Sequence, residues 1–319
     1  MEDRTGTEYA VSRMLTNEQV RDRLEMRGLI VAMERAFRGP STEYSAPPRW
    51  NLSREGCGAL VMPCQSSRYT AVKVSTWTHE PGRAARVVYA HYSMFDLVTG
   101  QPVLFCEAEA LTAMRTAAAS AMVTHKLASP GAKVLGIFGT GSLAREHLHA
   151  LRCVRPFERV LICGSTMEKS QRFAEQLTEE GLDVRAVSVD ECASQSDIIC
   201  TCTTSSIPLF DGRLLRPGTH VNAVGAFHAT DRELDSETIR RSTLIVDNRR
   251  GALAEAGEIV LPLREGLISQ DHIVADVGEL MRNEILISGG AGRVTVFKGL
   301  GLAMEDMVAA ELLVEIDVT

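Results

Sequence analysis

The spacing of hydrophobic positions changes along the chain, and the change predicts two kinds of structure. Between residues 44 and 105, short β-rich runs are separated by glycine, proline or charged turns, which is typical of a mainly antiparallel sheet. From residue 133 onward, apolar runs alternate with segments of helical spacing, which predicts parallel strands connected by helices. The candidate strands of this second part are VLGIF, RVLIC, VRAVS, DIICTCT, HVNAVG and TLIVD, and RVTVFKGLG is one more apolar run near the end.

Three helical patterns accompany these strands. Thr16 and Gln19 have the spacing of a capping box, and an apolar face continues from there until Gly39-Pro40 ends the helix. Residues 108–128 are rich in alanine and predict a tightly packed helix that bridges the two parts, while residues 303–316 predict a closing amphipathic helix. The pattern as a whole predicts an α/β protein, with a doubly wound Rossmann sheet and a separate α+β domain.

A glycine-rich turn follows the first strand of the alternating part. Val134–Phe138 is apolar, Gly139-Thr140-Gly141-Ser142-Leu143-Ala144 comes next, and a helical pattern continues to Leu151. In this context Gly139 allows a sharp turn, Gly141 lets a pyrophosphate approach the backbone, and the helix N-terminus presents unpaired N–H groups. We interpret the run as a dinucleotide-binding motif; an ordinary strand-to-helix turn is the alternative.

The end of the next strand bears on which dinucleotide is bound. An acidic residue commonly stands there to bind the ribose 2′-hydroxyl of NAD(H), and none is present in Gly164-Ser165-Thr166. Ser165 and Thr166, with Lys169 one turn later, are able to donate to a 2′-phosphate instead. This favours NADP(H) over NAD(H), although a simple turn with a helix cap explains the same residues.

Composition excludes several other classes of protein. A formal net charge of −7 without a basic cluster argues against nucleic-acid binding. The eight cysteines are scattered and lack the spacing of a metal site, so we expect reduced thiols and no bound metal. The N-terminus has no apolar signal region and no window is long enough to span a membrane. We therefore expect a cytoplasmic protein without a membrane or nucleic-acid partner.

Three cations outside the alternating part are candidates for binding an anionic substrate. Arg49 follows two prolines, Lys73 lies inside the strand-like run AVKVST, and Arg115 lies in the alanine-rich helix beside Thr116. A buried cation is costly without a partner, and two guanidinium groups with an ammonium are able to bind a carboxylate. Structural ion pairs are the alternative, and the sequence spacing alone does not bring the three together.

The order of several motifs resembles the ornithine cyclodeaminase/μ-crystallin family over nearly the whole chain. The RTAAASA and VNAVG…REL strings are the specific ones, whereas the glycine loop alone is not. The motifs that carry the resemblance are ALVMP (59–63), AVKVST (71–76), LTAMRTAAASA (111–121), GIFGTGSLAREH (136–147), VNAVGAFHATDRELD (221–235), IVDNRRGALAEAGEI (245–259) and TVFKGLGLAMED (295–306).

The resemblance implies a homodimer of two-domain chains that use NAD(H) or NADP(H). Residues 1–128 and 303–319 would form a discontinuous substrate-binding and dimerisation domain, and residues 129–302 the Rossmann domain. The implied substrate-carboxylate residues are Arg49, Lys73 and Arg115, of which Lys73 and Arg115 are also the implied catalytic residues. The implied cofactor contacts are Thr116, Gly139, Thr140, Gly141, Ser142, Leu143, Val224, Gly225, Lys298, Gly299 and Leu300.

One position departs from the pattern of the cyclodeaminases. They carry an Asp two residues after the Gly of VNAVG, where it acts on the substrate amine, and this chain has Phe227. A phenyl ring neither binds an ammonium by charge nor moves a proton, so Phe227 is expected to line an apolar side-chain pocket, or else to turn into the core. Glu255 stands at a family position close to the substrate and is expected to contact the amine; a solvated helix residue is the alternative.

These residues predict an NAD(P)-dependent oxidoreductase that acts on the CH–NH or C=N bond of an α-amino or imino acid. Arg49 and Arg115 would hold the carboxylate, and Lys73 would contact the carboxylate or the nitrogen and act as general acid or base. Two alternatives stay open. One is a cyclodeaminase that recycles its NAD internally, and the other is an NADPH-dependent ligand-binding protein like μ-crystallin.

Overall fold

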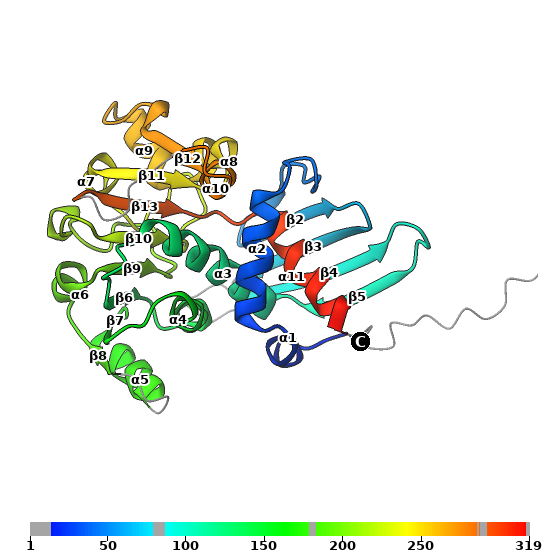
Figure 1. Cartoon of the computed structure of the whole chain (residues 1–319), viewed down its shortest axis with the longest axis horizontal. Helices are drawn as coiled ribbons and strands as arrows, with labels where there is room; N and C mark the ends of the chain where they lie inside the picture. The colour runs from blue at the N-terminus through cyan, green and yellow to red at the C-terminus, as the bar shows by residue number, and fades with distance from the viewer. Residues whose placement is uncertain (1–13, 79–86, 179–182, 286, 288–291, 317–319) are drawn as a thin grey trace, which may run out of the picture. The chain divides into compact units, whose positions relative to one another are not determined.

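The computed structural model describes residues 14–78, 87–178, 183–285, 287 and 292–316, and the chain divides into two compact units. Unit 1 consists of Met1–Arg115 with Leu302–Thr319, and unit 2 is Thr116–Gly301 (Figure 1). The boundaries expected from the sequence were 128/129 and 302/303. The first of these lies at the end of the alanine-rich helix α3 (Glu109–Leu127), whereas the observed division falls inside it.

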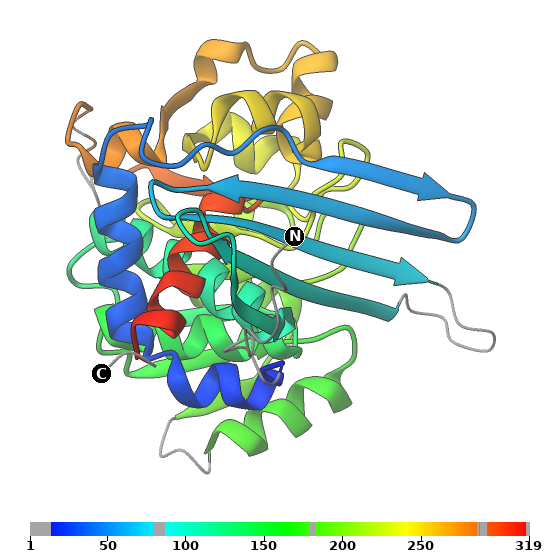
Figure 2. The ribbon, with the colours of Figure 1, turned by 90° about the vertical axis from the view of Figure 1, so that its right-hand side faces the viewer.

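Unit 1 is built on an antiparallel sheet with helices on one face (Figure 2). The strands follow one another in the order of the chain: β1 (Trp50–Arg54), β2 (Cys57–Gln65), β3 (Tyr69–Thr78), β4 (Val87–Asp96) and β5 (Pro102–Glu107). The helices of this unit are α1 (Asn17–Arg23), α2 (Met26–Arg38) and the last helix, α11 (Ala303–Ile316). Helix α11 packs on α2 and on strands β2, β3 and β5, so the far end of the chain completes this unit.

Alternation along the strands explains which face of the sheet is buried. In β3 the side chains of Tyr69, Ala71 and Lys73 are buried, and the intervening ones are more exposed. Since successive side chains of a strand point to opposite faces, the first set faces the helices.

The predicted capping box is also present, because the Thr16 hydroxyl accepts from the Gln19 N–H and the Gln19 carboxamide accepts from the Thr16 N–H.

Unit 2 contains an eight-stranded parallel sheet with helices between most strands, which confirms the predicted Rossmann doubly wound fold (Figure 1). The strand order is β12-β11-β13-β10-β9-β6-β7-β8. The strands are β6 (Val134–Phe138), β7 (Arg159–Cys163), β8 (Val184–Ala186), β9 (Ile198–Thr201), β10 (His220–Ala223), β11 (Ser242–Val246), β12 (Ile273–Asp276) and β13 (Val294–Lys298). The connecting helices are α4 (Ser142–Val154), α5 (Met167–Thr178), α6 (Val189–Gln195), α7 (Ser236–Arg241), α8 (Arg249–Glu255), α9 (Gly257–Arg264) and α10 (Val277–Met281), with 3-10 turns η1 (Gly212–Leu214) and η2 (Gln270–His272).

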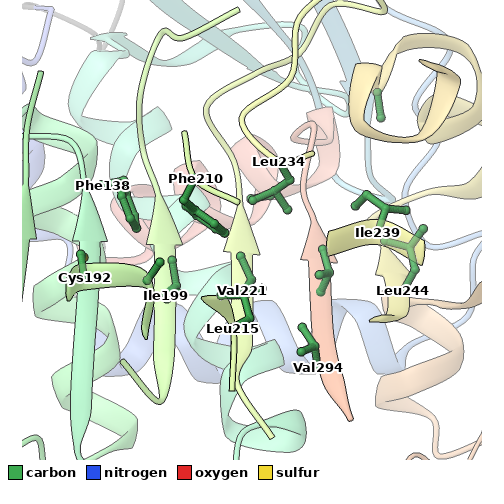
Figure 3. Packing of buried hydrophobic residues seen from close by; sticks show 14 of the residues in the cluster. Phe138, Cys192, Ile199, Phe210, Leu215, Val221, Leu234, Ile239, Leu244 and Val294 are labelled. Carbon is green, nitrogen blue, oxygen red and sulfur yellow. The ribbon is translucent and has the colours of Figure 1, made fainter. Parts of the chain in front are cut away.

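The core of unit 2 follows the central strands (Figure 3). Phe138, Ile199, Val221 and Leu244 contribute one buried side chain each from four strands, and Phe210 packs on Phe138 with ring centroids 5.1 Å apart. Strands buried on both faces read as continuous apolar runs, because helices cover the two sides of a parallel sheet. This is why the sequence shows these strands so plainly.

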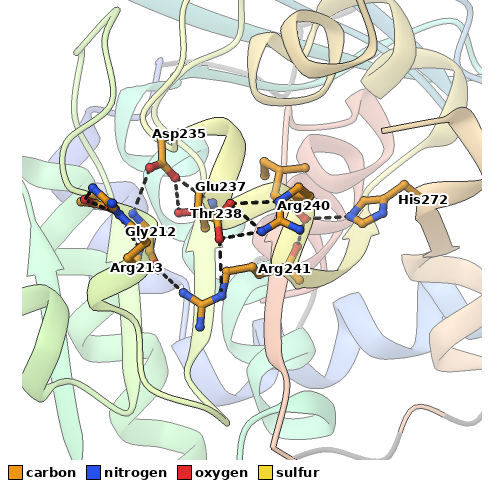
Figure 4. A network of polar contacts seen from close by, with 11 residues as sticks. Gly212, Arg213, Asp235, Glu237, Thr238, Arg240, Arg241 and His272 are labelled. Atoms are coloured by element: carbon orange, nitrogen blue, oxygen red, sulfur yellow. Dashed lines mark hydrogen bonds and ion pairs between the residues drawn. The ribbon is translucent and has the colours of Figure 1, made fainter. Parts of the chain in front are cut away.

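A polar network fastens the turn η1 to helix α7 (Figure 4). The Asp235 carboxylate accepts from the backbone N–H groups of Gly212 and Thr238 and caps α7. Arg241 donates to the Gly212 carbonyl, and Arg240 pairs with Glu237. These guanidinium groups therefore have local partners, and we assign the network to folding and not to ligand binding.

The second half of α3 belongs to unit 2 because its polar side chains bond there. The Ser120 hydroxyl lies 2.9 Å from Nε2 of His147 in α4, and the Thr124 hydroxyl accepts from the Asn222 carboxamide of β10 at 2.9 Å. His147 also lies 2.8 Å from the Leu143 carbonyl through Nδ1, which assigns the proton to Nδ1. These contacts, with the buried alanines between them, account for the division after Arg115.

Two buried histidines are expected to make unit 2 less stable in mild acid. Burial lowers the pKa of His147 to about 4, and burial likewise lowers the pKa of His220 to about 4. An unfolded chain has histidines near pKa 6.5, so between about pH 6.5 and pH 4 it binds protons that the folded chain does not. The free energy of unfolding should therefore decrease as the pH is lowered through this window, in total by on the order of 3 kcal/mol for each histidine.

Urea unfolding at pH 7.5, 6.5 and 5.5 measures this slope above the range in which most carboxylates titrate. The double variant His147→Gln and His220→Gln should show a flatter dependence. A wild-type free energy that does not change over these three pH values contradicts the assignment.

Candidate active site

The first candidate group is a cluster of charged side chains buried in unit 1. Lys73 lies in the middle of β3, paired with Met62 of β2 and Tyr92 of β4 on the face that the helices cover, and its side chain is 2% exposed. Arg115 reaches the cluster from α3, and Glu305 and Asp306 come from the first turn of α11. The exposed His91 lies on the opposite face of the sheet, since it pairs with Val74, the residue after Lys73.

One carboxylate contacts both cations. Nζ of Lys73 lies 2.8 Å from Oδ1 and 2.7 Å from Oδ2 of Asp306, and Nε of Arg115 lies 3.0 Å from Oδ1 of the same carboxylate. Arg115 also donates to Glu305 through its terminal nitrogen, and Lys73 donates to the Thr112 hydroxyl at 3.3 Å. The two cations are thus matched by two buried carboxylates.

Burial sets the protonation of the lysine. Removal from water lowers the pKa of Lys73 to about 8, the Asp306 carboxylate opposes this shift, and the Arg115 guanidinium adds to it. A lysine with a pKa of about 8 exchanges its proton near neutral pH, which is the property required of a general acid or base. An ordinary surface lysine does not have it.

The structure brings two of the three expected cations together. Lys73 and Arg115 share Asp306, while Arg49 lies directly before β1 and is partly exposed. Glu305 and Asp306 have no role predicted from the sequence, although both lie in the motif TVFKGLGLAMED. Two adjacent acids among apolar residues at a helix start were the available signal, because buried acids need cationic partners.

The second candidate group is the glycine turn of unit 2. Gly139 has a φ of +121°, and a Cβ there would lie 2.6 Å from the Cys202 carbonyl oxygen, so only glycine fits. Gly141 and Ser142 are exposed at the start of α4, where no side chain caps the helix, and a Cβ at Gly141 would meet no atom within 4 Å. The exposed backbone N–H groups at this helix start fit a pyrophosphate.

The end of β7 offers donors and no acid. Ser165 and Thr166 are exposed, and Nζ of Lys169 lies 3.1 Å from the Ser165 hydroxyl. The hydroxyl of Ser170 accepts from the Gly164 N–H at 2.7 Å, which fixes the turn. The expected 2′-phosphate residues therefore lie close together on the surface of unit 2.

A buried ionic network holds the segment after β10. The Glu233 carboxylate accepts from the backbone N–H of Gly225 at 2.7 Å, and Nζ of Lys298 donates to the Ala226 carbonyl at 2.5 Å. Lys298 also pairs with Glu258 at 3.1 Å, and Glu258 accepts from the Glu233 N–H at 3.0 Å. The expected cofactor contact of Lys298 does not extend to its ammonium group, which is fully buried in this network.

The remaining expected residues lie around these groups. Phe227 is 45% exposed and its ring lies against His228 with centroids 4.4 Å apart, so it does not turn into the core. Glu255 is the last residue of α8 and is partly exposed. The other expected contacts with the cofactor are Thr116 directly after Arg115, Thr140 and Leu143 of the glycine turn, and Val224 and Gly299 at the ends of β10 and β13.

Comparisons with known proteins identify the family of the chain. The model of the ornithine cyclodeaminase/mu-crystallin family matches residues 10–317. The chain belongs to this family. The resemblance inferred from the sequence motifs is therefore confirmed.

Members of the family with named reactions cover almost the whole chain. The ketimine reductase mu-crystallin of Mus musculus is 34% identical over 313 residues, which is 93% of this chain and 95% of the relative. The solved structure of Thermococcus litoralis Δ1-pyrroline-2-carboxylate reductase in complex with NADH and L-proline has a TM-score of 0.90 and 34% identity, and covers 96% of this chain and 97% of that one. An archaeal alanine dehydrogenase dimer with bound NAD has a TM-score of 0.88 at 27% identity, over 96% and 95% of the two chains.

Among the helices of the described residues, none has the length and apolar character needed to span a membrane. Within the same residues, no three His, Cys, Asp or Glu side chains gather as a metal site would require.

Proposed function

We propose that this chain is an NAD(P)H-dependent imine reductase that converts an α-imino acid into the corresponding amino acid. The observation that carries the proposal is the buried cluster in which one carboxylate, Asp306, contacts both Lys73 and Arg115. The glycine turn fits a dinucleotide, and relatives that cover most of the chain are named Δ1-pyrroline-2-carboxylate reductase and ketimine reductase. The expected reaction class, reduction of a C=N bond, agrees with those relatives.

In this mechanism each group has a defined task. Arg115, together with Arg49, binds the substrate carboxylate and fixes the imine carbon, which lowers the entropic cost of reaction. Lys73 holds the proton that the imine nitrogen receives. The helix start at Gly141 and Ser142 binds the pyrophosphate of the dinucleotide, which supplies the hydride when bound. Phe227 lines the pocket for the substrate side chain, and Glu255 contacts the substrate nitrogen.

The test is an activity screen in which NADPH and NADH are each offered with cyclic ketimines and with pyruvate plus amines. We expect oxidation of the coenzyme at 340 nm with a cyclic ketimine. Ornithine tests the cyclodeaminase alternative, because that reaction would release ammonia and proline with no net change at 340 nm. Phe227 disfavours it, since the ring lacks the carboxylate that would bind a distal amine. Tight NADPH binding without turnover of any imine would instead indicate a ligand-binding protein.

NADP(H) is the coenzyme that the end of β7 favours. Ser165, Thr166 and Lys169 present donors, and a carboxylate in this loop would repel a 2′-phosphate and accept from a ribose 2′-hydroxyl. Ser165→Asp is therefore expected to raise KM for NADPH about tenfold or more and to improve KM for NADH. Coenzyme titrations at saturating imine measure both constants, and the imine KM serves as the internal control. Unchanged preference in this variant contradicts the assignment.

We also propose that the chain acts as a homodimer in the cytoplasm. Trp50, Leu52 and Tyr89 lie on the sheet face of unit 1 opposite Lys73, and each is more than half exposed. Such a face is typical of an interface between copies. All eight cysteines are free thiols, which suits a reducing compartment. Sedimentation of wild type and Leu52→Glu tests the interface, and a wild-type monomer would contradict it.

A further inference from the structure

Asp306 occupies a special place in the buried cluster of unit 1. Its carboxylate is fully buried at the start of α11 and lies within hydrogen-bond distance of Nζ of Lys73 and of Nε of Arg115. Glu305, the residue before it, binds the terminal nitrogen of Arg115. Both acids therefore bind Arg115, and Asp306 also binds Lys73.

The geometry divides the tasks of the two cations. Asp306 and the Thr112 hydroxyl hold the Lys73 ammonium from two sides, which fixes its position on the sheet. Arg115 is oriented by Glu305 and Asp306 together, and its planar fork suits a carboxylate better than an ammonium does. Arg115 has five N–H donors, and its bonds to Glu305 and Asp306 use two of them, whereas the three donors of the Lys73 ammonium already serve Asp306 and Thr112.

We propose that Asp306 is a positioning residue that holds Lys73 as the proton donor to the imine nitrogen and leaves carboxylate binding to Arg115. The inference rests on the proposed imine reduction. In that step the imine carbon accepts a hydride from the reduced nicotinamide, which is thereby oxidised. The C=N π electrons form a new N–H bond with the Lys73 proton. The resulting neutral amine of Lys73 regains its proton from solvent.

The surroundings of Lys73 determine how its proton responds to Asp306. The charged groups that act on it are Arg115 from α3 and Glu305 and Asp306 from α11. Tyr92 of β4 and the thiols Cys64 of β2 and Cys106 of β5 lie near Asp306. Burial lowers the pKa of Lys73, Asp306 raises it, and Arg115 lowers it. Removing the charge of Asp306 therefore lowers the pKa of Lys73 further, so the lysine loses its proton at a lower pH.

The pH dependence of kcat distinguishes this role from a structural one. Activity of wild type should fall on the alkaline side, because the protonated lysine is required. In Asp306→Asn we expect this alkaline limb to move down by at least about one pH unit, which from a Lys73 pKa of about 8 is about a fivefold loss of kcat at pH 8. KM for the imino acid should stay equal or decrease, since the site becomes more positive. The matched control Glu305→Gln should move the limb in the same direction by clearly less and should raise KM, because Glu305 acts on the Lys73 pKa more weakly than Asp306 does and binds Arg115.

A conservative variant keeps the test decisive if Asp306→Asn does not fold. Asp306→Glu retains the charge and displaces it by one methylene, so the limb should stay near the wild-type pH while kcat falls. An alkaline limb at the wild-type pH in Asp306→Asn, an equal shift in Glu305→Gln, or an unchanged kcat in Asp306→Glu overturns the inference. Absence of imine turnover by wild type is a separate result, because it overturns the proposed reduction itself. Melting temperature and dinucleotide binding, measured for each variant, report whether the fold is intact.

Discussion

Arg115→Ala is expected to lose at least about 100-fold in kcat/KM for imino acids while dinucleotide binding stays nearly intact. Two hydrogen bonds from a guanidinium to a carboxylate contribute about 1.5–3 kcal/mol each, and about 1.4 kcal/mol corresponds to a tenfold change. The loss should appear mainly in KM, because the carboxylate is bound in the ground state and in the transition state alike. Steady-state kinetics with a saturating coenzyme measures it.

The structure adds a second effect to this variant. Arg115 is the partner of the buried carboxylates Glu305 and Asp306, so its removal leaves charge uncompensated inside unit 1. Breaking a buried ion pair from one side typically costs about 3–5 kcal/mol. Arg115→Lys is therefore the companion variant, since it keeps the charge and loses the fork. Its KM should still rise clearly with a smaller loss of stability. Wild-type kinetics in both variants would contradict the role of Arg115.

Lys298→Met should lower the free energy of unfolding by about 3–5 kcal/mol, because it leaves Glu258 without its buried counter-charge. Glu233 lies in the same network, and burial raises its pKa while Lys298 opposes that shift. The double variant Lys298→Met with Glu258→Gln removes one charge of each sign. It should recover much of the lost stability, because replacing a whole buried pair is far less costly than breaking it. Urea unfolding of the three proteins measures the effect.

Activity in the double variant reports on a different property. Lys298 donates to the Ala226 carbonyl and so helps to hold the segment that precedes Phe227. Without that donor the segment should remain mobile even when stability is restored, and kcat should stay reduced. A single Lys298 variant with wild-type stability would show that the ionic network is not held as described.

The sequence predicted most of unit 2 because its strands carry the strongest signal. Runs such as VLGIF are buried along nearly their whole length and contain no polar residue that would break the pattern. Strand β12 was missed, since it has only four residues at the edge of the sheet and two of them are not buried. The division inside α3 was not predicted either. It depends on where Ser120 and Thr124 bond, and an alanine-rich helix does not reveal in its sequence which neighbours its two halves contact.

In the candidate site, too, the sequence did not show which residues contact one another. Lys73 and Arg115 were recognised as unusual cations, and they do meet in the fold. Their partners Glu305 and Asp306 lie at the far end of the chain, and only the packing of α11 on β3 brings them close. Lys298 was expected at the cofactor from its motif position. A sequence does not show that its side chain turns inward to Glu258 and Ala226.

Transfer of deuterium tests the central claim most directly. Wild type is incubated with a cyclic ketimine carboxylate and NADPH or NADH that carries deuterium at both C4 positions of the nicotinamide, and the product is examined by NMR and mass spectrometry. The account predicts an amino acid with one deuterium on the carbon that bears the nitrogen, and no deuterium at any other carbon. An unlabelled product, or conversion of ornithine to proline with the label retained on the coenzyme, would contradict it.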